Sequence, residues 1–160
     1  MERREEGFTL IELMVVVLII AILLAIAIPT FLGAKGKAQD RAAQSNLRNA
    51  LQAEKTVYTD AQTYLGTSST EIASLQSAEP SLAWVSGAPP STDTGGTQQV
   101  YVLSAGNNSV VIAAVSANGA GSTCYFVQDN LVAGSATAGT KYASAPCSTA
   151  IGSLTWISHW

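Results

Sequence analysis

The chain has 160 residues, which suits one ordinary domain, and only 12% of them are charged while 48% are hydrophobic. Average proteins carry about 25% charged residues, so this sequence is poor in charge. The formal net charge is −3, and no segment is strongly basic, which argues against nucleic-acid binding by a single chain.

The N-terminus joins a short charged segment to a long apolar one. Residues 1–6 are nearly all charged, whereas no charged residue occurs from Leu13 to Ala34. A helix that crosses a bilayer needs about 20 apolar residues, so we predict a transmembrane helix here. A cleaved secretory signal is the alternative, but the apolar part of such a signal has about 7–15 residues, and this run is longer.

From Lys35 to about Leu65 the sequence becomes polar and rich in alanine, which predicts that the helix continues and becomes amphipathic. The apolar residues fall near helical spacing at Ala43, Leu47, Ala50, Leu51, Val57, Tyr58, Ala61 and Leu65. At 1.5 Å per residue the whole helix would be about 80 Å long. A domain this small cannot cover it, so we expect lipid or other copies of the chain to cover its first half.

Loops and strands are expected after Gly66. Three strands are predicted at Gln98–Leu103, Ser109–Val115 and Thr123–Val127, and a short fourth at Leu82–Val85. Turn-forming residues separate the three, which favours an antiparallel meander. The predicted fold class is α+β: a long N-terminal helix, apolar and then amphipathic, packed on a small antiparallel sheet.

Two cysteines, Cys124 and Cys147, lie late in the chain and after the apolar segment. This position predicts an exported domain with one disulfide, worth about 3 kcal/mol in the chain-entropy model. Two free buried thiols are the alternative. We expect no zinc site, because the cysteines lack a close spacing and His159 is the only histidine.

Residues Gly7 to Glu12 read Gly-Phe-Thr-Leu-Ile-Glu, and the uncharged apolar segment follows at once. A charged leader, a Gly-Phe junction and an acidic residue five positions beyond the junction together resemble the class III signal of type IV prepilins and related pseudopilins. The resemblance covers about the first 35 residues in detail. It implies a leader peptide at 1–7, a transmembrane and filament-core helix at 8–34, and a soluble pilin domain at 35–160.

The resemblance also implies how the precursor is processed. Gly7 would be the last leader residue, cut on the cytoplasmic side by a prepilin peptidase, and Phe8 would become the N-methylated N-terminus. A plain spacer at the start of the helix is the alternative for Gly7. The leader departs from the family pattern, because its two arginines are outnumbered by three glutamates. Since Lys35, Lys37 and Arg41 follow the apolar run, the cytoplasmic N-terminus rests on the resemblance more than on charge.

Glu12 is a hypothesis for a functional site because a carboxylate at the edge of a membrane span is costly. In the family that it resembles, the matching glutamate meets the amino terminus of a neighbouring subunit, and cleavage creates such an amine at Phe8. Glu12 would then set the register of assembly, with Thr9 assisting by hydrogen bonding. The alternatives are a carboxylate that faces headgroup water and an ordinary threonine at a helix start.

Three residues late in the apolar segment are expected to make the helix flexible. Pro29 removes one backbone hydrogen bond, and Gly33 and Gly36 weaken the same stretch. A similar proline in related pilins marks a segment that bends or melts in the filament. A static kink is the alternative.

No catalytic motif is found, so we expect no enzyme activity, cofactor or small-molecule substrate. Asp93 and Asp129 are the only acidic residues after Glu79, too few for a calcium site.

The resemblance implies a structural subunit of a type IV pilus. It would be a single-pass membrane precursor that inner-membrane machinery polymerises into a homopolymeric surface filament for adhesion, motility or DNA uptake. The alternatives are a pseudopilin of a type II secretion system and, in another class, a binding module or enzyme that the helix merely tethers.

Overall fold

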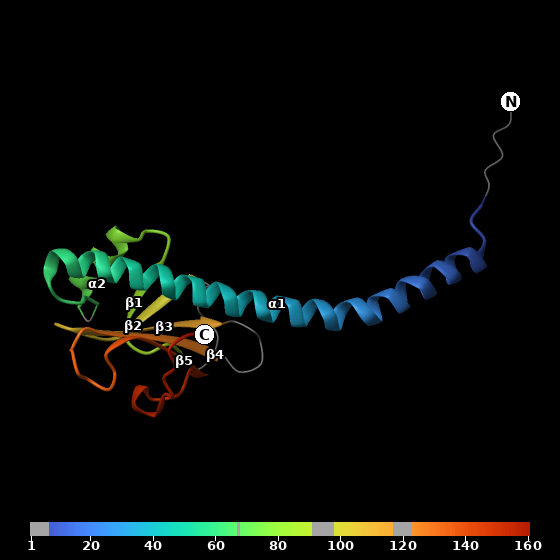
Figure 1. Cartoon of the computed structure of the whole chain (residues 1–160). Coiled ribbons are helices and arrows are strands. Elements are labelled where there is room, and N and C mark those ends of the chain that lie inside the picture. Colours follow the sequence, from blue (N-terminus) through green and yellow to red (C-terminus); the bar gives the residue numbers. More distant parts are fainter. Residues whose placement is uncertain (1–6, 67, 91–97, 117–122) are drawn as a thin grey trace. The chain divides into compact units, whose positions relative to one another are not determined.

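The computed structural model describes residues 7–66, 68–90, 98–116 and 123–160 (Figure 1). The chain divides into two compact units, one ending at Lys35 and the other running Gly36–Trp160. Helix α1, Leu10–Ala61, contributes to both. It is the one helix of the described residues that is long and apolar enough to cross a membrane.

The second unit contains a sheet of five strands in the order β1-β2-β3-β4-β5. These are β1 Ala83–Ser86, β2 Gln99–Gly106, β3 Ser109–Ser116, β4 Thr123–Asn130 and β5 Gly139–Pro146. Strands β2 to β5 pair antiparallel, and β1 adds to β2 in parallel. The predicted α+β class, with a helix packed on a mostly antiparallel sheet, is confirmed.

The core lies between the amphipathic half of α1 and one face of the sheet (Figure 1). Leu47 and Ala50 of α1 are fully buried against apolar strand residues of that face, among them Val100, Ile112 and Val127. Alternate strand residues form a second cluster on the opposite face, which the C-terminal segment covers. Both faces of the sheet are therefore covered within the second unit.

Two elements differ from the sequence expectation. Helix α2, Ser69–Ala78, occupies a stretch expected to form a loop, and it begins with a capping box between Ser68 and Glu71. Strand β5 forms from a stretch that reads as small and polar, because it pairs along the whole length of β4. Turn residues 117–121, expected between the last two predicted strands, fall mostly outside the described residues.

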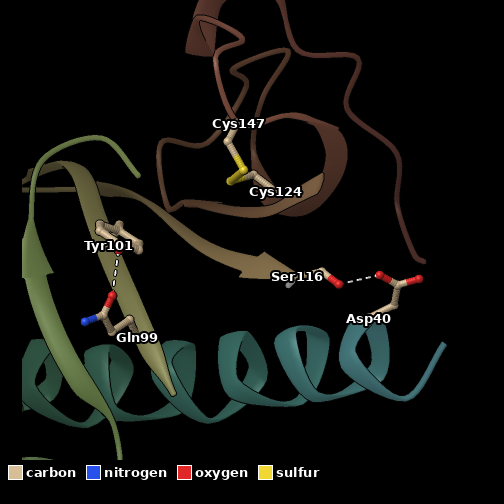
Figure 2. Close-up of a disulfide and its surroundings, with 6 residues drawn as sticks. All are labelled: Asp40, Gln99, Tyr101, Ser116, Cys124 and Cys147. Atoms are coloured by element: carbon tan, nitrogen blue, oxygen red, sulfur yellow. Dashed lines mark hydrogen bonds between the residues drawn. A yellow bond between two sulfur atoms is a disulfide. The ribbon is translucent and has the colours of Figure 1, made fainter. Parts of the chain in front are cut away.

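The expected disulfide between Cys124 and Cys147 is present and links β4 to the segment after β5 (Figure 2). Beyond it, the C-terminal segment returns to β5 through a bridge between Tyr142 and Ile157. Trp160 then packs against Tyr125 and Tyr142, with ring centroids 5.1 Å and 4.9 Å away. The C-terminus is thereby fastened to the sheet on the side that faces α1.

A buried carboxylate lies where α1 ends. Glu54 is fully buried, and its Oε2 accepts a hydrogen bond from the Leu65 backbone N–H at 3.3 Å. Its Oε1 has no partner in the described structure. Burial raises the pKa of Glu54 to about 8, and the nearby Glu71 carboxylate raises it further. The folded protein therefore holds this proton far more tightly than an unfolded chain does.

This proton predicts a pH dependence of stability. Between the unfolded pKa of Glu54, about 4.5, and about 8, the folded state binds more protons, so stability should fall as the pH rises. The slope from this residue is at most about 1.4 kcal/mol per pH unit. In urea unfolding of a fragment that begins at Lys37, Glu54→Gln should flatten the decline between pH 5 and pH 8. Asp60→Asn, which changes an exposed acid of the same helix, is the control and should leave the slope unchanged. Equal slopes for the wild type and Glu54→Gln would contradict this account.

Candidate functional site

The start of α1 brings together the two residues predicted to guide assembly. The Thr9 backbone N–H donates to Glu12 Oε2 at 2.9 Å, and the Thr9 hydroxyl donates to the same oxygen at 2.6 Å. In return, the Glu12 backbone N–H donates to Thr9 Oγ1 at 3.3 Å. Because α1 begins at Leu10, Thr9 is the N-cap residue and Glu12 the third helical residue, which makes a capping box.

The capping box uses only one oxygen of the carboxylate. Both bonds from Thr9 end on Glu12 Oε2, and Oε1 accepts no hydrogen bond from the described residues. Glu12 is exposed, as is Phe8, whose side chain is 82% accessible. The site therefore presents a carboxylate oriented by its own helix, with one oxygen open to a cation from outside the chain.

The junction between Gly7 and Phe8 lies just before this box, in exposed backbone that is not helical. A protease binds its substrate in an extended form, so the junction has the conformation that cleavage requires. A side chain at Gly7 would meet no atom within 4 Å, so nothing in the described chain blocks access. The rest of the expected leader, residues 1–6, lies outside the described residues.

The apolar part of α1 is bare on every side. None of its most apolar stretch is buried within the chain, and side chains from Leu10 to Leu32 keep about half or more of their surface exposed. A helix that is apolar all round is stable only when something else surrounds it. The surface available for lipid or for other chains is thus the whole circumference of the helix.

The three residues expected to loosen this helix all lie inside α1. Pro29 cannot donate a backbone hydrogen bond, and the Thr30 hydroxyl bonds instead to the carbonyls of Ile26 at 3.2 Å and Ala27 at 2.9 Å. A Cβ at Gly33 would meet nothing within 4 Å, so contacts inside the chain do not require glycine there. Gly36 is the first residue of the second unit. A flexible joint stays a prediction.

The described residues contain no group of three His, Cys, Asp or Glu side chains that could hold a metal ion. A cleft of about 430 Å³ lies beside the disulfide and is lined by Ala88, Pro89, Leu103, Cys147, Ser148, Thr149, Ala150 and Ile151. None of these residues is an acid or base that could transfer protons. As far as the described chain extends, the cleft lacks the groups that catalysis needs.

Sequence reasoning missed one contact that positions α1. The Ser116 hydroxyl at the end of β3 donates to Asp40 Oδ1 at 2.6 Å (Figure 2). Asp40 and Ser116 are 76 positions apart in the chain, so no local pattern links them. The capping box, in contrast, has a sequence signal in the spacing Thr-x-x-Glu.

Comparison with known proteins finds similarity in the N-terminal part of the chain. The family described as "Prokaryotic N-terminal methylation motif" matches residues 3–28. The type IV major pilin protein PilA of Myxococcus xanthus is 44% identical over 61 residues, 38% of this chain and 28% of the relative. The type II secretion system core protein G of Dickeya chrysanthemi is 45% identical over 47 residues, 29% of this chain and 31% of the relative.

A third relative is the type IV wide pilus major component PilA4 of Thermus thermophilus, 40% identical over 62 residues, 39% of this chain and 47% of the relative. The matched part of the chain thus spans less than half the length of each of these relatives. The similarity is concentrated where the capping box and the apolar helix lie.

The glycine in the bare helix generates a test. Gly33→Ala should strengthen this part of α1 by about 1 kcal/mol, because alanine has the higher helix propensity and finds open space. In amide hydrogen exchange of the full chain in nanodiscs, amides near residues 29–36 should exchange about fivefold more slowly. Gly7→Ala, outside the helix, is the control. Unchanged exchange in Gly33→Ala would show that this glycine does not loosen the helix.

Proposed function

Because the chain belongs to the type IV pilin and pseudopilin superfamily, we propose that it is a structural subunit of a type IV pilus. One observation carries the proposal: a Gly-Phe junction, an oriented Glu12 and an apolar helix with no partner of its own follow one another directly. The combination suits a chain that is stored in a membrane and then packed among its copies. The limited length of the matches leaves the second unit's role to this proposal alone.

Processing prepares the site at the helix start. A prepilin peptidase hydrolyses the peptide bond between Gly7 and Phe8, which leaves a carboxylate on Gly7 and a protonated amine on Phe8. The enzyme then transfers a methyl group from a methyl donor to this amine, and the resulting secondary amine keeps its positive charge. The exposed, non-helical backbone at the junction supports this step.

Assembly then pairs opposite charges between subunits. The positive amine of one subunit approaches Glu12 Oε1 of another, while Thr9 continues to hold Oε2. Neither charge is favourable alone in an apolar surrounding, so only the register that pairs them is stable. The apolar helices exchange lipid contacts for contacts with one another, and the second unit faces solvent.

In this proposal the precursor crosses the membrane once with its N-terminus in the cytoplasm, and inner-membrane machinery lifts it into a homopolymer at the cell surface. Adhesion, motility or DNA uptake would be the output. The chain itself would be no enzyme, which the lack of acids and bases around the cleft beside the disulfide supports.

A pseudopilin of a type II secretion system is the second candidate. The similarity to core protein G of Dickeya chrysanthemi and of Aeromonas hydrophila favours it, because it matches the same helix at 45% identity. Both candidates share the junction, Glu12 and the apolar helix. They differ in whether abundant filaments leave the cell surface.

Shearing cells and analysing the pelleted filaments by mass spectrometry tests the proposal. We expect abundant filaments made of this chain, each beginning with a methylated Phe8. Processed chain that stays in the envelope without surface filaments would favour the pseudopilin. A mature product that begins after Ala34 and is found free in the medium would overturn both.

A further inference from the structure

The first turns of α1 in the second unit separate positive from negative charge. Asp40 is half-buried, and it bonds to Ser116 (Figure 2) and faces Tyr125, whose pKa burial and this carboxylate raise. Lys37 and Arg41, on either side of Asp40 in the sequence, are exposed. The only acid of this stretch is thus directed to the sheet, and the exposed surface here is cationic.

These cations have no partner within the described chain. Neither Lys37 nor Arg41 forms a hydrogen bond or an ion pair with a described residue, and the same holds for the exposed Lys35. No acidic residue occurs between Glu12 and Asp40. Lys55, further along α1, differs, because its Nζ lies 3.4 Å from Asp129 Oδ1. A chain of net charge −3 therefore leaves three basic residues unpaired close together.

The three cations follow the apolar segment directly. That segment ends at Ala34, and Lys35, Lys37 and Arg41 are the next charged residues apart from Asp40. The polar headgroup region adds about 5–8 Å on each side of the hydrocarbon core. If the apolar segment spans a bilayer, as the proposed function requires, these long side chains lie at the level of the lipid phosphates.

We propose that Lys35, Lys37 and Arg41 form a phosphate-binding collar that holds the unassembled subunit to anionic phospholipids at the membrane surface. The proposal rests on membrane storage of the precursor. A cation beside an anionic membrane contributes about a fivefold preference for that surface. The collar fixes the depth of the apolar helix, and its contacts must be released when the subunit leaves the membrane.

Anionic lipid fits this surface better than nucleic acid does. Nucleic-acid binding increases with the number of phosphates that are neutralised, and the unpaired cations here are few and confined to one short stretch. Arg48 is also exposed and unpaired among the described residues, but it lies two further helical turns along α1. It therefore serves as a control position.

The test uses the full chain in nanodiscs made of equal parts phosphatidylglycerol and phosphatidylcholine, which differ in net charge. Native mass spectrometry counts the lipids that stay bound after the nanodisc is removed. The comparison is between the wild type, Lys37→Gln with Arg41→Gln, and a matched control, Arg48→Gln with Lys141→Gln. Both pairs remove two positive charges.

We expect the wild type and the control to retain phosphatidylglycerol about three- to fivefold over phosphatidylcholine, and the preference to weaken in high salt. Lys37→Gln with Arg41→Gln should bring the ratio close to one. Equal ratios for wild type and this pair, or an equal loss in the control, would overturn the collar. A chain that inserts normally without lipid preference refutes only the collar, whereas failure to insert also contradicts membrane storage.

Discussion

An apolar helix that its own chain does not cover needs partners, and this need governs the rest of the molecule. In the first unit the side chains from Leu10 to Leu32 are exposed on every side of α1. The second unit supplies no cover, because its sheet is already buried by the amphipathic half of α1 on one face and by the C-terminal segment on the other. Lipid before assembly and sister helices afterwards both satisfy the requirement.

The second unit stays folded through either change of surroundings because its links are internal. Apolar packing around Leu47 holds α1 to the sheet. The buried Asp129 accepts hydrogen bonds from Tyr64 and Thr140 and pairs with Lys55, so that one carboxylate joins α1, the turn after it and two strands. With the disulfide fastening the C-terminal segment, no link of this unit depends on the first one.

The sequence predicted features that follow from local pattern and failed where distant pairing decides. The uncharged run, the helical spacing around Leu47 and the alternation in β3 and β4 were sufficient for the fold class. Strand β5 was missed because it contains few large apolar residues and forms by pairing with β4. Helix α2 was missed although Ser68 and Glu71 have capping-box spacing, since the serine and threonine cluster was interpreted as a loop. The link between Asp40 and Ser116 has no local signal, and the burial of Glu54 follows from the turn after α1.

The central claim is that a charge on Glu12, beyond its capping of the helix, aligns each new subunit. Glu12→Gln tests it most directly, because glutamine keeps a side-chain acceptor for Thr9 but removes the charge. Glu12→Ala, which removes both, is the companion variant. With equal amounts of processed subunit in the membrane, the account predicts that both variants reduce sheared filament mass at least about tenfold, the loss that corresponds to about 1.4 kcal/mol per added subunit. Normal filament mass from Glu12→Gln would contradict it, since capping alone would then suffice.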